Sequence, residues 1–333
     1  MLETEERFTP RADISVVIPS FNRRDSLCAL VSALCAQHAP WLAVETIVVL
    51  DGSTDGSAEA LAALTPPPGW RLVVHAQPNR GLSAARNAGW RRATGEVVLF
   101  LDDDVVPGEG LLAAHLHAHH AADAVLGCIV PQVLPGTEVL AAPETEFLAT
   151  RHGHLTQPTA MVGPLDVAGG HLSVKRRWLQ AVDGFDETFV TYGSEDTEFA
   201  QRLLAAGVRF AYAPDAAVVH PYTGTARQWQ RRAWHTGRSH VKLTAKHPAL
   251  KPLLGWDNPG GRSWQQRLAT RWGLRCPRVA MVLSTLLLTS APVGWRLGSH
   301  RLALRLARFG RSLAYWSGVR SALGAGQLHV AKG

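Results

Sequence analysis

The sequence contains few cysteines, and their spacing fits neither a disulfide framework nor a zinc site. The 333 residues include only four, and no two of them form a C-x-x-C pair; they are Cys28, Cys35, Cys128 and Cys276. Each lies in an apolar or helical context, so we expect reduced, buried thiols in a cytosolic protein. Residues 1–11 are polar and acidic without an apolar segment, so we also expect no secretory signal peptide.

Acidic residues are almost absent from the last third of the chain. Residues 227–333 contain 19 lysines and arginines and a single acid, Asp257, which gives a net charge of +18. The preceding 226 residues carry 15 basic and 26 acidic residues, a net charge of −11. Seven of the eleven tryptophans also lie in the basic part. This asymmetry indicates a polyanionic partner, either a membrane surface or a nucleic acid.

No apolar run in the basic part reaches the roughly twenty residues that span a bilayer. The run at 279–291 has only thirteen. Beyond it, apolar residues recur at helical spacing between arginines: Leu302, Leu306, Phe309, Leu313 and Trp316. Such a stripe fits an interfacial helix on anionic lipid, but equally a helical hairpin packed on the rest of the protein, and both can hold together.

The most informative stretch is the run of three carboxylates at Asp102, Asp103 and Asp104. They directly follow the apolar residues 97–101, which are typical of a strand buried on both faces. Adjacent anions repel one another, so we expect the fold to supply a cation. Oxygen ligands suit Mg²⁺ or Mn²⁺, which commonly bridge protein carboxylates and phosphates. A solvated acidic turn is the alternative interpretation.

Strand and helix patterns alternate through the first hundred residues. We expect strands at 14–18, 44–50, 71–75 and 97–101, with helices at 26–38, 57–64 and 83–92 between them. This order predicts a parallel α/β sheet, in which ligands bind at the carboxyl ends of the strands. Polar residues follow all four strands and therefore predict a binding rim: Ser20, Asn22, Asp51, Asn79, Arg80 and Asp102–Asp104.

The second half of the chain is less regular. His115 and His119 have the spacing of a metal pair on a helix at 110–122, but no third ligand is evident, so we favour a solvated helical face. Residues 135–164 are rich in Pro, Gly and Thr, and we expect a mobile loop over the site. Further elements are expected as strands at 125–133, 167–174, 208–213 and 216–219, and a helix capped by Ser194 that runs to residue 204.

Several motifs together resemble the family 2 glycosyltransferases of the GT-A fold, over residues 13–222. They are ISVVIPSFN (14–22), VLDGSTD (49–55), NRGLSAARN (79–87), FLDDD (100–104), GSED (193–196) and His220. The resemblance implies a Rossmann-like mixed, mainly parallel α/β sheet flanked by helices, with a C-terminal helical extension. We expect a tail at 1–12, a GT-A domain at 13–225 and a basic, tryptophan-rich helical region at 226–333 that could associate with a membrane.

The resemblance also implies roles for individual residues. Asp196 would be the general base and Glu195 would support it, while Asp104 and His220 would bind Mn²⁺ or Mg²⁺. Nucleotide-sugar binding would fall to Pro19, Phe21, Asp51, Arg80, Arg86, Asp102 and Asp103, with Asp51 accepting a hydrogen bond from the base. Two positions depart from the family pattern: Leu50 replaces a frequent Asp, and Arg23 stands where an acid is frequent.

The implied activity is an inverting hexosyl transfer (EC 2.4) from a nucleotide-sugar donor to a hydroxyl of a glycan or lipid-linked acceptor, in cell-envelope polysaccharide or glycolipid synthesis. We expect a cytoplasmic enzyme, peripheral on the inner face of the membrane. Gln228 and Arg231 give only part of the Q-x-x-R-W motif of processive members, which favours single additions.

Two other functions remain open on the sequence alone. A nucleotidyltransferase would want a glycine-rich phosphate loop after the first strand, where residues 19–22 read PSFN. A nucleic-acid-binding protein would use the basic tail, but the body is acidic and carries no nucleic-acid motif, so we expect no nucleic-acid partner.

Overall fold

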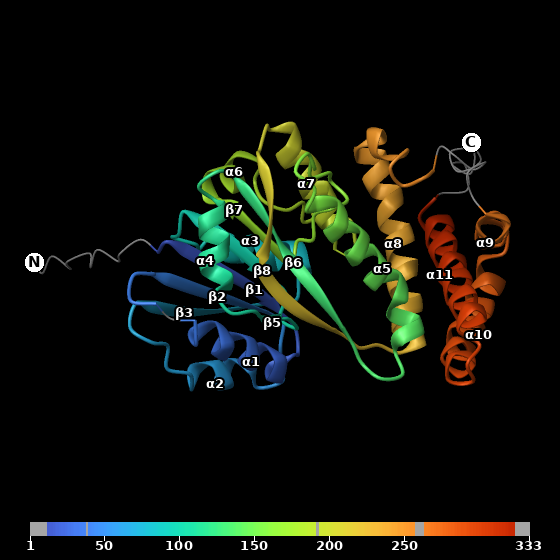
Figure 1. Ribbon diagram of the computed structural model, residues 1–333, viewed down its shortest axis with the longest axis horizontal. Helices are drawn as coiled ribbons and strands as arrows, with labels where there is room; N and C mark the ends of the chain where they lie inside the picture. The colour runs from blue at the N-terminus through green and yellow to red at the C-terminus, as the bar shows by residue number, and fades with distance from the viewer. Residues whose placement is uncertain (1–11, 38, 191–192, 257–262, 324–333) are drawn as a thin grey trace, which may run out of the picture.

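The computed structural model describes residues 12–37, 39–190, 193–256 and 263–323. Nearly all of the tail expected at 1–12 therefore lies outside the described residues. In the first half, strands and helices alternate as the sequence predicts (Figure 1). The elements are β1 (Ile14–Ser20), α1 (Arg24–Cys35), β2 (Val44–Asp51), α2 (Ser57–Ala62), β3 (Trp70–Gln77), α3 (Leu82–Trp90) and β4 (Val97–Leu101).

The second half completes an eight-stranded mixed sheet in the order β3-β2-β1-β4-β7-β6-β8-β5. The four strands β1, β2, β3 and β4 are parallel to one another, whereas β7 runs antiparallel to both β4 and β6. The two short strands expected at 208–219 form one strand, β8, parallel to β6. The elements are β5 (Val106–Pro107), α4 (Leu111–Ala118), β6 (Ala124–Val133), α5 (Glu138–Leu155), β7 (His171–Lys175), α6 (Arg176–Ala181), α7 (Glu195–Ala205) and β8 (Phe210–Tyr222). The expected mixed α/β sheet is confirmed.

The sheet is buried on both faces because alternate residues of its central strands enter two different hydrophobic clusters. In β4, Leu99 packs with α1 and α4 on one face, and Phe100 packs with α3 and α7 on the other. On that second face Phe100 meets Phe185 edge to face at 5.1 Å, and Phe185 stacks on Phe199 at 4.2 Å. The carboxylates that follow β4 therefore start from a fixed strand end.

The prediction of a mobile loop at 135–164 is wrong, because most of this segment forms helix α5 (Glu138–Leu155). Pro143 lies inside this helix and does not end it. Apolar residues on both sides of the proline are buried at helical spacing, among them Leu140 and Leu148, so packing outweighs the cost of the missing N–H group.

The expected solvated histidine face is also wrong. His115 is fully buried and His119 nearly so, while His117 on the same helix is exposed. His115 donates to or accepts from His171 (3.1 Å between the Nε2 atoms) and Ser173 (2.8 Å), and His119 Nε2 lies 2.7 Å from Ser173 Oγ. The histidines thus form a buried polar network beneath α4.

The four cysteines are free, as expected, but none is fully buried. Cys28, Cys35 and Cys128 are half-buried, and Cys276 is exposed at the start of α10.

The basic C-terminal region is a helical layer built from α8 (Ala226–Lys246), a short 3₁₀ turn (Pro248–Leu250), α9 (Trp264–Arg275), α10 (Pro277–Arg296) and α11 (His300–Ala322). In Figure 1, α9, α10 and α11 lie at the end of the molecule farthest from β3, and α5 and α8 lie between them and the sheet. One mixed apolar cluster joins α5, α8, α10 and α11, and Arg308 of α11 pairs with Glu146 of α5 at 2.6 Å. The hairpin interpretation is therefore correct: the helices pack on the rest of the protein.

The buried histidine network predicts a stability that depends on pH. Burial lowers the pKa of His115, of His119 to about 4 and of His171 to about 3, and neighbouring cationic or histidine side chains add to the effect on His115 and His171. In the unfolded chain these histidines have an ordinary pKa near 6.5, so below that pH proton binding favours the unfolded state. The stabilising contribution of the buried, neutral histidines is therefore present above pH 6.5 and is lost as the pH falls toward 4.

We expect the free energy of unfolding, from urea titrations at pH 7.5 and 4.5, to fall at the lower pH. His115→Gln removes one of the buried sites, so it should reduce this fall, whereas the exposed His117→Gln should not. Equal pH dependence in both variants would contradict the account.

Candidate functional site

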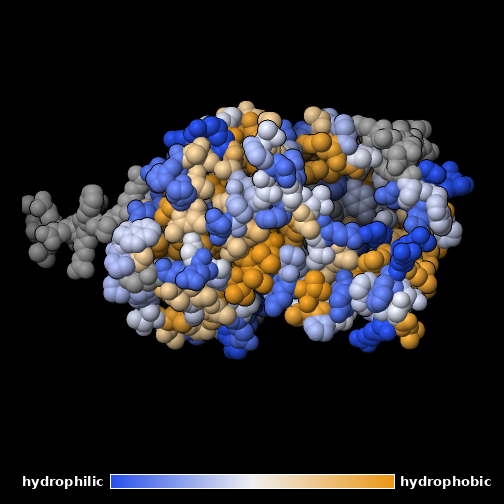
Figure 2. All heavy atoms as spheres, in the orientation of Figure 1, coloured by the Kyte–Doolittle hydropathy of each residue, from blue (hydrophilic) through white to orange (hydrophobic). Residues whose placement is uncertain are grey.

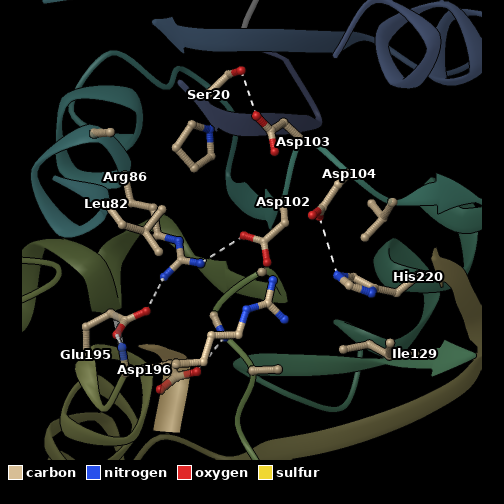
Figure 3. A pocket seen from close by; sticks show the side chains of 18 of the residues that line it. Ser20, Leu82, Arg86, Asp102, Asp103, Asp104, Ile129, Glu195, Asp196 and His220 are labelled. Carbon is tan, nitrogen blue, oxygen red and sulfur yellow. Dashed lines mark hydrogen bonds and ion pairs between the residues drawn. The ribbon is translucent and has the colours of Figure 1, made fainter. Parts of the chain in front are cut away.

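The predicted rim residues surround one cavity of about 690 Å³ at the carboxyl ends of β1, β2 and β4. Residues from the loop before β7, from β8, and from helices α5, α7 and α8 complete its wall. Ten of the predicted site residues line it: Pro19, Phe21, Asp51, Arg86, Asp102, Asp103, Asp104, Glu195, Asp196 and His220. Figure 3 shows that Asp102, Asp103 and Asp104 lie around the same space as Glu195 and Asp196, which are some ninety residues farther along the chain.

Arg80 is the predicted site residue that the cavity does not include. Its side chain is 62% exposed and pairs with Glu187 at 3.0 Å, so it points away from the cavity. Only its backbone contributes, because the Arg80 N–H donates to Asp51 Oδ1 at 2.9 Å. The Arg80 side chain therefore does not line this cavity, and its expected contact with the nucleotide stays a prediction.

Asp51 holds the turn that follows β3. Its Oδ1 accepts from the Arg80 N–H and from Gln77 Nε2 (2.8 Å), and its Oδ2 accepts from the Gly81 N–H (2.8 Å). Since each carboxylate oxygen has two lone pairs, Oδ2 keeps one acceptor position. Asp51 thus shapes the wall of the cavity and retains room for one further donor.

The three consecutive acids after β4 find three different sets of partners. Asp102 pairs with Arg86 at 3.1 Å, Asp103 accepts from Ser20 Oγ at 2.7 Å, and Asp104 pairs with Arg23. The expectation that the fold supplies a cation to the acidic run is correct, and two arginines supply it. The contact between Asp102 and the chain before β7 is close, since a Cβ on Gly170 would lie 2.0 Å from Asp102 Oδ2. A glycine is required there.

The environments of Asp103 and Asp104 move their pKa values in opposite directions. Burial raises the pKa of Asp103 to about 6, although Ser20 and Arg23 oppose the rise. Burial also disfavours the ionised form of Asp104, but His220 and Arg23 outweigh it and hold its pKa below the usual carboxyl range. Asp104 therefore stays ionised well below neutral pH, whereas Asp103 takes up a proton near pH 6.

Glu195 and Asp196 occupy the first turn of α7. The residue before them, Ser194, adopts φ 73°, a left-handed conformation that non-glycine residues rarely take, and its side chain makes none of the expected cap hydrogen bonds. Glu195 Oε1 lies 3.4 Å from Arg86 Nη1, and Asp196 accepts from the backbone N–H groups of Thr197 (2.8 Å) and Gly169 (3.5 Å).

Both of these carboxyls are shifted toward the protonated form. Burial, and then the charge of Asp196, raises the pKa of Glu195 to about 7 against the opposing effect of Arg86. Burial also raises the pKa of Asp196. A carboxyl whose pKa approaches neutrality is well suited to take up a proton at physiological pH.

Arg86 joins the two groups of acids. Its guanidinium pairs with Asp102 through Nη2 and with Glu195 through Nη1, and it lies 5.2 Å from the centre of the Phe185 ring. The side chain is only 3% exposed. Figure 3 shows Arg86 between Asp102 and Glu195. Its sequence motif did not reveal this bridging position, because Glu195 lies more than a hundred residues away from Arg86 in the chain.

Asp104 and His220 form a pair that fits a divalent ion. His220 Nε2 lies 3.5 Å from Asp104 Oδ1, and His220 Nδ1 is buried without a hydrogen-bond partner. A carboxylate oxygen and an imidazole nitrogen suit Mn²⁺ or Mg²⁺ when phosphate oxygens supply further ligands. Across the parts of the chain that the structure describes, no group of three or more His, Cys, Asp or Glu side chains is placed to hold a metal. The pair therefore needs ligands from a bound phosphate.

Helices α5 and α8 contribute wall residues that sequence reasoning did not assign: Glu144, Phe147, Leu148, Arg151 and Thr236. Arg232 of α8 also lines the cavity. Trp229 is instead buried, with Arg232 and Arg311 each 5.1 Å from its ring centre. The α5 segment gave little signal, because its apolar residues show almost no amphipathic periodicity and Pro143 lies inside it.

Comparisons with known proteins agree with this geometry. The model of glycosyl transferase family 2 matches residues 15–180, and a model described as the N-terminal domain of galactosyltransferase matches residues 162–223. The pre-mycofactocin glycosyltransferase of Mycobacterium tuberculosis is 29% identical over 245 residues, 71% of this chain and 48% of that protein. The validoxylamine A glucosyltransferase of Streptomyces hygroscopicus subsp. jinggangensis is 27% identical over 281 residues, 73% and 63%. The chain thus spans about half to two thirds of these relatives.

Solved structures share the fold. A mannosyltransferase from Pyrobaculum calidifontis, in complex with GDP-Man and Mn²⁺, matches with a TM-score of 0.61 at 22% identity over 92% of this chain and 87% of that one. Residues 1–349 of S. aureus TarS, in complex with UDP, match with a TM-score of 0.53 at 19% identity over 93% and 90%. The predicted GT-A fold is confirmed.

The bridging position of Arg86 predicts a large loss of stability when its charge is removed. Arg86→Gln leaves two carboxylates without their buried cation, and breaking such a pair costs about 3–5 kcal/mol. Arg80→Gln is the matched control, because the exposed Arg80–Glu187 pair contributes about 1 kcal/mol or less. Urea denaturation at pH 7.5 measures both, and equal losses in the two variants would contradict the bridging role.

Proposed function

The chain belongs to glycosyl transferase family 2, and on that premise we propose that it transfers a hexosyl group from a nucleoside-diphosphate sugar to an acceptor hydroxyl. The observation that carries the proposal is the single cavity that Asp196 shares with Asp104 and His220. A carboxylate for the acceptor proton thus lies in the same space as a pair suited to the diphosphate end of a donor. The family match favours sugar transfer over nucleotidyl transfer and nucleic-acid binding, the two alternatives left by the sequence.

The proposed reaction is a single displacement. The acceptor oxygen attacks the anomeric carbon as Asp196 takes the hydroxyl proton, and the bond from that carbon to the diphosphate oxygen breaks with its electron pair. The nucleoside diphosphate leaves, and the anomeric configuration inverts. A divalent ion held by Asp104 and His220 would neutralise charge on the leaving group. Glu195, fixed by Arg86 and by the Gly193 N–H (3.1 Å), holds the first turn of α7 in place.

The donor end of the proposed complex would lie at β1 and β2. Pro19 and Phe21 form an apolar edge there, and the Phe21 side chain is half exposed and available to contact a base. The solved neighbours include complexes with UDP, UDP-GlcNAc and GDP-Man, which supports a nucleotide-sugar donor. Relatives include a succinoglycan biosynthesis protein of Rhizobium meliloti, which supports a glycan or lipid-linked acceptor in envelope polysaccharide synthesis.

Replacement of the proposed base gives a direct test. Thermal shifts with UDP-, GDP- and dTDP-sugars, with and without Mn²⁺, select the donor. With that donor and a panel of alkyl-glycoside and lipid-linked acceptors, Asp196→Asn should lower kcat by about 10²–10⁴-fold, the usual contribution of a general base. Nucleotide binding, measured by calorimetry, should remain. Full activity in Asp196→Asn would rule out this role.

We also propose that the enzyme binds the cytoplasmic face of an anionic membrane through α10. Helix α10 has twenty residues, and an 18-residue window within it has a mean hydropathy of 1.3; among the described residues it is the one helix long and apolar enough to cross a membrane. Four apolar side chains form an exposed stripe on it: Val279, Val282, Leu286 and Val293, each more than half exposed. In Figure 2 the end of the molecule that α9, α10 and α11 form, on the right, carries hydrophobic and hydrophilic residues side by side.

This surface differs from the one that the sequence suggested. Leu313 and Trp316 of α11 are buried in the helical layer, so the stripe at 302–316 does not face outward as a whole. The α10 stripe is flanked instead by exposed arginines, among them Arg275, Arg278 and Arg301. Apolar side chains next to cations match the interface of an anionic bilayer.

Vesicle sedimentation tests this surface. Val282→Asp combined with Leu286→Asp should weaken binding to phosphatidylglycerol vesicles by about tenfold or more, because two apolar side chains no longer enter the interface. Trp41→Ser, at a 68% exposed apolar residue before β2, is the control and should bind as the wild type does. Undiminished binding of the double variant would exclude α10 as the membrane-facing surface.

A further inference from the structure

Arg23 is the residue in the site that departs most from the family pattern, and the structure holds it firmly in place. The preceding residue, Asn22, has φ 52°, and its N–H donates to Ser53 Oγ at 3.0 Å while its Oδ1 accepts from the Thr54 N–H at 2.8 Å. On the other side, the Arg24 N–H donates to Asp55 Oδ2 at 2.8 Å. The loop after β2 thus fixes the backbone on both sides of Arg23.

From this position the Arg23 guanidinium reaches the acids after β4. Its Nη1 hydrogen bonds to Asp104 Oδ2 and lies 3.4 Å from Asp103 Oδ1. His220 faces the other carboxylate oxygen of Asp104, Oδ1, at 3.5 Å. The carboxylate that best fits a divalent ion is therefore already neutralised by a cation of the chain itself. A guanidinium and a metal ion on one carboxylate repel each other and compete for its charge.

Arg23 also has space to leave Asp104. Its side chain is 44% exposed, and it lies on the boundary between the main cavity and a second cavity of about 660 Å³. The wall of the second cavity includes Arg231 and Arg232 together with Asp104. The guanidinium can therefore move without unfolding its surroundings. Arginine binds phosphate oxygens through the same donors that it uses for carboxylates.

We propose that Arg23 couples divalent-metal binding to diphosphate binding. In the free protein the guanidinium occupies Asp104 and weakens metal binding. When the diphosphate of a nucleotide enters, the guanidinium exchanges the carboxylate for phosphate oxygens and leaves Asp104 to the metal. Metal and nucleotide then bind cooperatively, each raising the affinity for the other by the same factor. This inference rests on the proposed function, because it takes a nucleoside diphosphate as the ligand of the cavity.

Binding measurements without turnover test the coupling. The Kd of Mn²⁺ is measured by electron paramagnetic resonance of the free ion, with and without saturating UDP or GDP. For the wild type we expect weak binding of Mn²⁺ alone and a strong gain with nucleotide. Arg23→Gln should tighten binding of Mn²⁺ alone by about tenfold and reduce the gain from nucleotide by a similar factor, within the usual range of coupling between sites.

Two further variants separate charge from other effects. Arg24→Ala removes the adjacent arginine, which pairs with Asp25 at 2.9 Å, and should bind Mn²⁺ as the wild type does. Arg23→Lys keeps the positive charge, so its affinity for Mn²⁺ alone should stay nearly as low as that of the wild type. Circular dichroism and thermal melting confirm that each variant is folded.

The outcomes distinguish this inference from the function on which it rests. Equal Mn²⁺ affinity in the wild type and Arg23→Gln, or weaker binding in the variant, would overturn the coupling role and leave the proposed function intact. If neither protein bound UDP or GDP, with or without Mn²⁺, the proposed function would fail and the inference with it.

Discussion

The ion pairs of the buried Arg86 side chain with Asp102 and Glu195 are the interactions on which the rest of the site depends. One guanidinium from α3 holds the end of β4 and the beginning of α7, two segments more than ninety residues apart in the sequence. Removing charged groups from water is costly, so such an arrangement persists only when each charge has its partner. Because Arg86 pairs with both carboxylates at once, Asp102 and Glu195 line the same cavity. Asp196, the residue after Glu195, is thereby also placed in the wall of this cavity.

The mixed sheet makes this arrangement possible. Four parallel strands deliver polar residues to one edge, and the antiparallel strand β7 then brings the segment at Gly169 and Gly170 against Asp102 and Asp196. Strand β8 adds His220 from the far side, and α5 and α8 complete the wall. The C-terminal helices pack on α5 and α8, so the basic region forms part of the site and also extends away from it.

The sequence predicted the features that depend on local patterns. Apolar runs followed by polar residues located β1, β2 and β4 and the acids after them, because strand burial and strand ends are visible in consecutive residues. Features that depend on contacts between distant segments were not predictable in this way. The burial of His115, the outward direction of Arg80 and the contact of Arg86 with Glu195 are all decided by partners more than fifty residues away. Helix α5 was missed because Pro143 is a local signal that tertiary packing overrides.

The central claim is that Asp104, His220 and Asp196 serve one donor in one cavity. A crystal structure of the wild-type protein with Mn²⁺ and an intact nucleotide sugar, in the absence of acceptor, tests it most directly. We expect the ion on Asp104 and His220, the diphosphate bound to it, and the face of the anomeric carbon opposite the diphosphate turned toward Asp196. A donor bound outside this cavity, or one whose sugar lies out of reach of Asp196, would contradict the account.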